Sequence, residues 1–124
     1  MHISFATITV LDQDRAKDFY MGVLGMTEQI DSEPEGMLRW VQLGLPGGNT
    51  SLVLFPTDAV PETEMPVLVL AVEDLHALEA TLTGAGAEAG AEVTQPVAPA
   101  PWNEEALHLM FHDPEGNLVL ATQT

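Results

Sequence analysis

The four histidines are the residues of this chain best suited to bind a metal ion or to carry a proton. His108 and His112 are four residues apart in a segment that should form a strand, so they share a face but lie about 13 Å apart. The same spacing on a helix would let both bind one ion, and on a strand it does not. His76 should be exposed on a helix, and His2 lies near the first residue. His108 therefore remains a candidate for ligand contact, with an ordinary polar residue as the alternative.

A second group of polar and aromatic residues lies around position 40. Arg39 is one of three basic residues in the chain, and it could bind an anionic group or pair with one of the many carboxylates. Trp40 and Gln42 alternate with Val41 and Leu43, as in a strand. If the aliphatic pair faces the core, Trp40 and Gln42 face the opposite side, where a ligand could reach them.

The composition restricts the partners. The sequence of 124 residues has 19 acidic and 3 basic residues and a formal charge of −16. This charge repels nucleic acid and anionic membranes, so neither is expected as a partner. It would favour a cationic small molecule, although solubility or an acid-rich proteome is the simpler explanation. With no cysteine, no secretion-like leader and no apolar run of membrane length, we expect a cytoplasmic protein without disulfides.

The chain contains two copies of one pattern, which defines the elements that must position these residues. In each copy an alternating strand precedes an aspartate, a helix with apolar residues at helical spacing, and a closing glycine. Asp12 and Asp74, the expected helix N-caps, are 62 residues apart, and Gly25 and Gly86, which should end the helices, are 61 residues apart. This nearly constant offset indicates an internal duplication.

Each copy is predicted to have the order β-α-β-β-β. The strands are expected at residues 3–10, 28–30, 38–43 and 51–55 in the first copy, and at 67–72, 91–95, 107–112 and 118–122 in the second. The turn Asp113-Pro114-Glu115-Gly116 should join the last two strands. We expect one domain over residues 1–124, with a first module at about 1–57, a linker at about 58–66 and a second module at about 67–124.

Alternation along the first strand of each copy separates two faces. The residues expected under the helices are Ala6, Ile8 and Val10 in the first copy and Leu68, Leu70 and Val72 in the second. No helix covers the opposite sides, which should therefore line a concave face shared by the two copies. Its residues would be Phe5, Thr7, Thr9, Val67, Val69 and Ala71.

Four stretches carry a resemblance to a known family: VLDQDRAKDFYMGVLGM (10–26), RWVQLGLPGG (39–48), VEDLHALEATLTGAGAE (72–88) and FHDPEGNLVL (111–120). With these motifs the chain resembles the vicinal oxygen chelate superfamily, which includes glyoxalase I, bleomycin-resistance proteins and extradiol dioxygenases. The resemblance implies an α+β fold in which two βαβββ modules form a curved, mostly antiparallel, eight-stranded cup, commonly within a homodimer. It implies no single function, because the superfamily contains both enzymes and binders.

The same resemblance implies four metal-ligand positions, one on the first and one on the last strand of each module. They fall on Phe5, Val53, Val67 and Leu120, where metal-dependent members have His, Gln or Glu. These side chains offer no donor to a divalent cation, which needs about four N or O ligands. Burial of an uncompensated cation among them would also be costly. We therefore predict neither a metal ion nor another cofactor.

A proline-rich segment, TQPVAPAPWNEEA (94–106), surrounds Trp102. Proline lacks the N–H that a central strand needs, so the segment is predicted to be a loop. In relatives a comparable Pro-Trp segment borders the ligand cavity, which would make Trp102 a lid or a stacking wall; otherwise it anchors the loop. Glu104 and Glu105 would meet a cationic ligand or only contribute to a solvated acidic loop.

The leading expectation is a metal-free, bleomycin-resistance-like protein that binds a small organic molecule, cationic or amphiphilic, in an apolar cavity. The alternatives are a glyoxalase- or dioxygenase-like enzyme with a non-standard or metal-independent site, and a regulatory or structural dimer. No acid–base pair can be placed from the sequence, so no catalytic residue is assigned. The predicted ligand-binding residues are Phe5, Thr7, Trp40, Gln42, Val53, Phe55, Val67, Trp102, His108, Met110 and Leu120.

Overall fold

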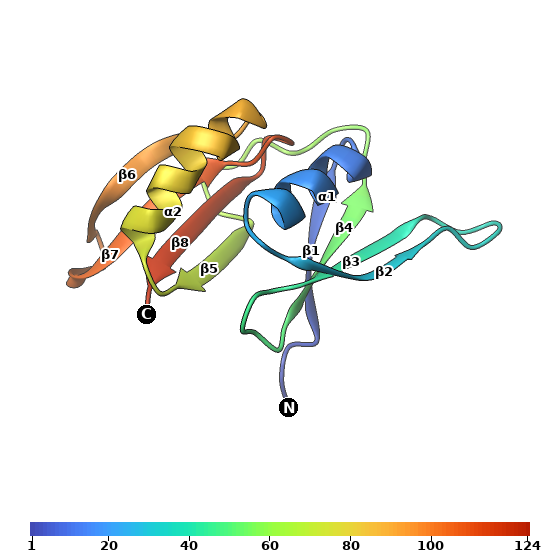
Figure 1. The fold of residues 1–124 in the computed structure, drawn as a ribbon, viewed down its shortest axis with the longest axis horizontal. Coiled ribbons are helices and arrows are strands. Elements are labelled where there is room, and N and C mark those ends of the chain that lie inside the picture. Colours follow the sequence, from blue (N-terminus) through green and yellow to red (C-terminus); the bar gives the residue numbers. More distant parts are fainter. The chain divides into compact units, whose positions relative to one another are not determined.

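The computed structural model describes residues 1–124, which form two compact units, Met1–Pro61 and Glu62–Thr124 (Figure 1). Each unit contains one four-stranded mixed sheet and one helical segment. The order of elements in both units is β-α-β-β-β, which confirms the order predicted from the repeat. None of the helices has the length and hydropathy needed to cross a membrane.

Sheet A, in the first unit, has the strand order β1-β4-β3-β2. Its strands are β1 (Phe5–Val10), β2 (Thr27–Ser32), β3 (Trp40–Gly44) and β4 (Ser51–Pro56). β1 and β4 are parallel, and the other two pairs are antiparallel. The ends of these strands differ from the predicted ends by no more than two residues.

Sheet B, in the second unit, repeats this topology with the order β5-β8-β7-β6. Its strands are β5 (Leu68–Val72), β6 (Glu92–Ala100), β7 (Asn103–His112) and β8 (Leu118–Gln123). The predicted turn joins β7 to β8: Asp113 Oδ1 accepts the backbone N–H groups of Glu115 (2.9 Å) and Asn117 (2.8 Å). Gly116 has a φ of 92°, a conformation that glycine adopts without a steric cost.

Both helices begin at the predicted aspartates. α1 (Gln13–Gly22) follows Asp12, whose Oδ1 accepts the N–H of Arg15 at 3.0 Å, and α2 (Leu75–Thr81) follows Asp74, whose Oδ1 accepts the N–H of Ala77 at 3.0 Å. The two caps also have nearly the same φ and ψ, −137° and 105° against −139° and 99°. The repeat is therefore visible in local hydrogen bonding as well as in topology.

The prediction that Gly86 ends the second helix is wrong. The chain continues from α2 into a π-helical segment, η1 (Leu82–Gly86), and then into a further helical turn. A Cβ at Gly86 would lie 3.3 Å from the backbone oxygen of Thr81, so glycine permits the close approach of two helical turns. The helical path ends at Gly90, which has a φ of 102°.

The predicted loop at residues 94–106 is also wrong, because most of it forms a β-hairpin. β6 includes Pro96 and Pro99, which the sheet accommodates because β6 is an edge strand and its pairing with β7 is interrupted by register shifts. Val97 N donates to Glu79 Oε2 on α2 (2.7 Å). Proline thus excludes a central strand but not an edge strand.

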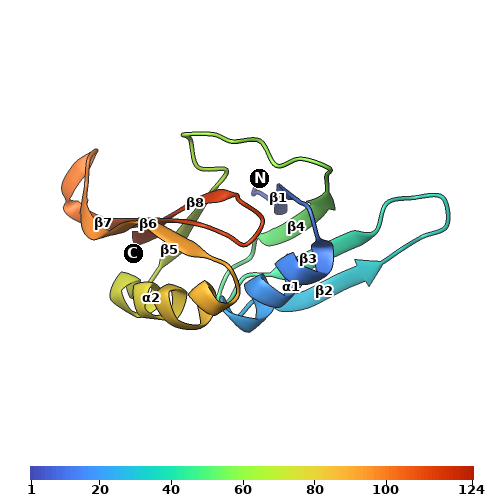
Figure 2. The same cartoon turned by 90° about the horizontal axis from the view of Figure 1, so that it is seen from above.

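The predicted division of the strand faces is confirmed within each unit. α1 covers one face of sheet A, and α2 covers one face of sheet B (Figure 2). On β1, Ile8 and Val10 are buried while Thr7 is exposed, and on β5, Leu70 is buried while Val69 is exposed. Each unit therefore has one face under a helix and one face that no helix covers.

Candidate ligand-binding face

The side of sheet A that α1 does not cover is the first candidate site, and we call it the open face of sheet A. Strand pairing places Thr7 opposite Val53 and Val53 opposite Gln42, so these three side chains share this face. By the same alternation its members are Phe5, Thr7, Thr9, Thr27, Gln29, Ile30, Ser32, Trp40, Gln42, Gly44, Ser51, Val53 and Phe55. None of them is charged, although 18% of the residues in the chain are.

Three aromatic rings form a cluster on this face. The ring of Trp40 contacts Phe5 and Phe55 edge to face, with centroid distances of 5.8 Å and 5.2 Å and interplanar angles of 89° in both pairs. Such pairs contribute about 0.5–1.5 kcal/mol each beyond the burial of their area. Phe5 is 41% exposed, so the cluster retains an accessible apolar surface.

A chain of side-chain hydrogen bonds begins at the same tryptophan. Trp40 Nε1 donates to Gln42 Oε1 (3.1 Å), and Gln42 Nε2 donates to Gln29 Oε1 (3.0 Å). Ser51 Oγ donates to the same Gln29 oxygen (2.6 Å). Gly44 leaves space for the Gln29 amide, because a Cβ at Gly44 would lie 2.7 Å from Gln29 Nε2. Aromatic and amide groups are thus adjacent on one uncharged surface.

A bulge in β2 places two consecutive residues, Gln29 and Ile30, on this face. Glu28 pairs with Leu43 and Ile30 pairs with Gln42, which leaves Gln29 as an extra residue in the strand. Glu28 therefore stays on the side of α1, whereas the Gln29 amide lies on the open face, bonded to Gln42. Bulges often redirect side chains next to binding and active sites.

The positions where metal-dependent relatives bind their ion do not fit a metal here. Phe5 and Val53 lie on the open face of sheet A, where Val53 pairs with Thr7, two residues after Phe5. Val67 and Leu120 are related in the same way, because Leu120 pairs with Val69. None of these side chains has a donor atom, and no three His, Asp or Glu side chains elsewhere in the chain gather in a metal-binding arrangement.

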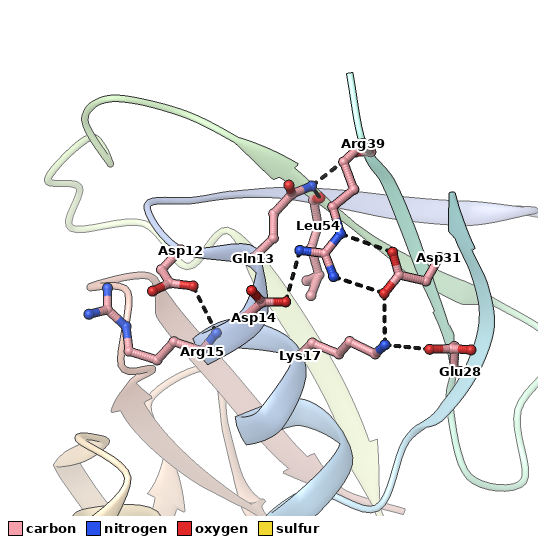
Figure 3. Close-up of polar contacts among 9 residues, drawn as sticks. All are labelled: Asp12, Gln13, Asp14, Arg15, Lys17, Glu28, Asp31, Arg39 and Leu54. Carbon is pink, nitrogen blue, oxygen red and sulfur yellow. Dashed lines mark hydrogen bonds and ion pairs between the residues drawn. The ribbon is translucent and has the colours of Figure 1, made fainter. Parts of the chain in front are cut away.

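The opposite side of sheet A carries a cluster of ion pairs (Figure 3). Asp31 on β2 accepts hydrogen bonds from Arg39 Nε (2.9 Å), Arg39 Nη2 (2.8 Å) and Lys17 Nζ (2.8 Å). Lys17 also pairs with Glu28, and Arg39 Nη1 pairs with Asp14 Oδ1 (2.8 Å). Of the two roles considered for Arg39, pairing with carboxylates is confirmed, and this ion-pair cluster links α1 to β2 and to the residue before β3.

The ion pairs shift the pKa values of the cluster. Hydrogen bonds from Arg39 and then Lys17 hold the pKa of Asp31 well below its ordinary value of 3.8. Hydrogen bonds to Asp31 and Glu28 raise the pKa of Lys17 above 10.5, and those to Asp31 and Asp14 raise the pKa of Arg39. Gln13 Nε2 adds two uncharged links, to the backbone oxygens of Arg39 and Leu54 (2.9 Å each). The cluster therefore supports the scaffold on the side away from the open face.

The side of sheet B that α2 does not cover is the second candidate site, the open face of sheet B. His108 and Met110 lie on it, opposite Thr122 and Leu120 of β8. His108 Nδ1 lies 3.0 Å from the backbone oxygen of Ala98, and since a carbonyl only accepts, Nδ1 carries the hydrogen and the neutral ring has its lone pair on Nε2. In this tautomer Nε2 is the ring atom that can accept a hydrogen bond.

Trp102 lies in the turn between β6 and β7 and is 59% exposed. Its ring contacts His108 edge to face, with a centroid distance of 5.5 Å and an interplanar angle of 70°. His108 itself is only 6% exposed. The contact gives Trp102 a neighbour within its own unit, and its role as a lid or stacking wall stays a prediction.

The predicted ligand-binding residues thus lie on two faces. Phe5, Thr7, Trp40, Gln42, Val53 and Phe55 are on the open face of sheet A. In the second unit, His108, Met110 and Leu120 are on the open face of sheet B, Val67 precedes β5, and Trp102 is in the hairpin turn. Gln29 and Ser51 also belong to this face and are not among the predicted residues, although Ser51 stands two positions before Val53 and could have been found by strand alternation.

Comparison with known proteins agrees with this architecture. Residues 2–120 match the family model of the Glyoxalase/Bleomycin resistance protein/Dioxygenase superfamily. No protein of curated function matches the chain. The crystal structure of TnmS3, an antibiotic binding protein from Streptomyces sp. CB03234, is 31% identical with a TM-score of 0.78, over 99% of this chain and 95% of that one.

Two further crystal structures are similar over nearly their whole length. A glyoxalase/bleomycin resistance protein from Streptomyces sp. CB03234 is 31% identical with a TM-score of 0.75, over 98% of this chain and 100% of that one. A superfamily member from Sphaerobacter thermophilus DSM 20745 is 28% identical with a TM-score of 0.81, over 100% of this chain and 98% of that one.

Proposed function

Because this chain belongs to the Glyoxalase/Bleomycin resistance protein/Dioxygenase superfamily, we propose that it binds a small organic molecule on the open face of sheet A without a metal ion. The observation that carries this proposal is the cluster of Phe5, Trp40 and Phe55 beside an uncharged hydrogen-bond network. Binding sites for organic molecules combine such apolar surface with a few well-placed polar groups.

The likeness to TnmS3 supports the ligand class. That protein is described as antibiotic binding, and it shares 31% identity with this chain over nearly the full length of both. The absence of donor atoms at Phe5, Val53, Val67 and Leu120 supports binding through contact and hydrogen bonds rather than coordination. An antibiotic or a chemically related natural product is therefore the ligand that we propose.

Titration of the ¹⁵N-labelled protein with bleomycin and a panel of aromatic antibiotics tests the binding function. At least one compound should shift the resonances of Trp40 and its neighbours on β1, β3 and β4 in a saturable way, and calorimetry should give one site. Phe5→Ala should weaken this binding by about tenfold, since it removes exposed aromatic contact area. Met37→Ala is the matched control, because Met37 is 72% exposed outside this face.

Metal analysis of the purified protein tests the metal-free part. We expect substoichiometric Zn, Mn, Ni and Fe, and unchanged binding of the antibiotic in the presence of a chelator. One equivalent of bound metal whose removal by the chelator abolishes antibiotic binding would overturn this part, and a panel without any saturable binder would overturn the binding function.

A catalytic role for His108 is the second candidate function. The observation that favours it is the fixed imidazole, whose Nε2 can accept a proton once Nδ1–H is bonded to Ala98 O. If His108 acts as a base, a substrate bound to this protein should be converted with a rate that His108→Gln abolishes while binding persists. Unchanged compound recovered after incubation with the protein would favour the binding function.

We also propose a homodimer, as the superfamily resemblance implies. Light scattering at micromolar concentration should then give twice the monomer mass of 13.3 kDa. If the mass stays at the monomer value while the ligand still binds, the homodimer proposal is wrong and the binding function stands without it.

A further inference from the structure

We propose that the open face of sheet A binds an uncharged aromatic group whose hydrogen-bond acceptor, such as a ketone or ester oxygen, is held by the side-chain amides of Gln29 and Gln42. This inference rests on the proposed binding function and narrows its ligand class. It differs from the cationic ligand that the acidic composition suggests, because the composition describes the whole surface and this face has no charge of either sign.

The direction of the hydrogen-bond chain is set by Trp40. An indole N–H only donates, so the Gln42 atom that faces it at 3.1 Å must be the amide oxygen. The amide nitrogen of Gln42 then faces Gln29 at 3.0 Å, and the Gln29 atom that receives it must also be an oxygen. Ser51 Oγ, which can donate or accept, donates to that oxygen at 2.6 Å.

This direction determines what the network offers a ligand. The oxygens of Gln42 and Gln29 already accept one and two hydrogen bonds, respectively. One N–H of Gln42 and the NH₂ group of Gln29 are left as donors, and Gln29 is exposed. Ser51 is only 6% exposed, so its oxygen contributes little to the accessible surface. The surface therefore presents N–H groups and favours a ligand with an acceptor.

The surroundings favour an aromatic and uncharged ligand. Phe5, Trp40 and Phe55 flank the amides and supply flat apolar contact area. Lys17 and Arg39 are paired with carboxylates on the other side of the sheet, so neither can neutralise an anion on this one, and the members of this face include no carboxylate for a cation. A charged ligand would lose its hydration without gaining a counter-ion, which disfavours its binding.

Four benzene derivatives of similar size serve as probes: acetophenone, ethylbenzene, benzoate and benzylammonium. Binding is followed by the indole N–H resonance of Trp40 and the side-chain NH₂ resonances of Gln29 and Gln42. Acetophenone should bind about fivefold more tightly than ethylbenzene, the gain expected for one neutral hydrogen bond. Benzoate and benzylammonium should both bind more weakly than acetophenone, and the order should not change between low and high salt.

Trp40→Phe tests the positioning role of the indole. The variant keeps an aromatic ring but loses the donor that orients Gln42, so the preference for acetophenone over ethylbenzene should fall to below twofold. The affinity for ethylbenzene should stay within about twofold, a result that a merely structural loss would not give.

Gln42→Glu removes the N–H donors and should weaken acetophenone binding about tenfold. Asn49→Asp, the same amide-to-acid change in the exposed turn after β3, should leave it unchanged.

Several outcomes would overturn this inference and leave the proposed function intact. One is equal binding of acetophenone and ethylbenzene at Trp40, and another is tighter binding of benzylammonium or benzoate there. A third is an antibiotic that shifts the Trp40 resonance but leaves the side-chain NH₂ resonances of Gln29 and Gln42 unchanged. Resonances of this face that change with protein concentration, and with neither acetophenone nor any antibiotic, would assign the face to a second copy of the chain and overturn both the inference and the proposed function.

Discussion

Asp31 and Arg39 form a two-pronged ion pair, in which Arg39 Nε is 2.9 Å from Asp31 Oδ1 and Arg39 Nη2 is 2.8 Å from Asp31 Oδ2. The planar guanidinium matches the geometry of a carboxylate, so the pair fixes orientation as well as charge. Lys17 on α1 shares the same carboxylate. Asp31 on β2 therefore joins α1, through Lys17, to Arg39, the residue before β3.

Asp31→Asn should destabilise the protein at pH 7 by about 1 kcal/mol, the upper range for a partly exposed ion-pair network. Urea unfolding measures the effect. The matched control is Asp58→Asn, which removes the same charge from an exposed residue of this acidic chain. A cost equal to that of the control would show that the cluster contributes nothing specific.

The contribution of Asp31 should depend on pH with a definite sign. Its pKa is lowered in the folded protein, so its ion pairs stabilise the fold fully above the unfolded value of about 4 and lose this effect as the pH falls below it. The gap in unfolding free energy between the wild type and Asp31→Asn should therefore narrow between pH 4 and pH 2. A difference in unfolding free energy that widens between pH 4 and pH 2 would contradict a lowered pKa of Asp31 in the folded protein.

Asp74→Ala should cost about 1 kcal/mol, because it removes the acceptor for the N–H of Ala77 at the start of α2. Asp74→Ser keeps a capping oxygen and should recover most of that loss. The two variants can be compared by thermal and urea unfolding. Equal losses in both would mean that the charge of Asp74, rather than its cap, matters.

The same substitution should have opposite effects at two glycines. Gly116 has a φ of 92°, so Gly116→Ala should destabilise the protein by about 1–2 kcal/mol. Gly22 ends α1 without a positive φ, and no atom lies within 4 Å of a Cβ placed there. Gly22→Ala should therefore stabilise the protein by about 0.5–1 kcal/mol. Unfolding curves that move in the same direction for both would contradict this expectation.

His108 should have its hydrogen on Nδ1 at a pH where the ring is neutral, because that nitrogen faces the Ala98 carbonyl oxygen at 3.0 Å. Long-range ¹H–¹⁵N spectra of the imidazole groups distinguish the tautomers. The exposed ring of His76 provides an internal reference in the same spectrum. An Nε2–H tautomer at His108 would remove the argument for an available Nε2.

The elements that depend on local sequence were predictable. Asp12 and Asp74 cap their helices because a short side-chain acceptor satisfies an N–H group two or three residues later, and this needs no tertiary context. Alternation of Val41 and Leu43 with Trp40 and Gln42 likewise sorts the faces of β3, since a strand always alternates.

The elements that depend on neighbouring strands or helical turns were not predictable from the sequence. Pro96 and Pro99 indicated a loop, but a strand at the edge of a sheet tolerates proline because one side has no partner. Gly86 indicated a helix end, but it serves a close approach between two helical turns. Gln29 and Ile30 both lie on the open face because of a bulge, and a bulge is a property of two paired strands, which one strand alone does not reveal.

The unpaired position of Gln29 also bears on how this surface can diversify. Glu28 and Asp31 keep their contacts with Lys17 through the residues that pair normally, whatever side chain occupies the position between Glu28 and Ile30. Selection can therefore retune recognition at this single site while the scaffold behind it stays intact. A library randomised at position 29 should yield folded variants with altered ligand preference far more often than one randomised at position 31.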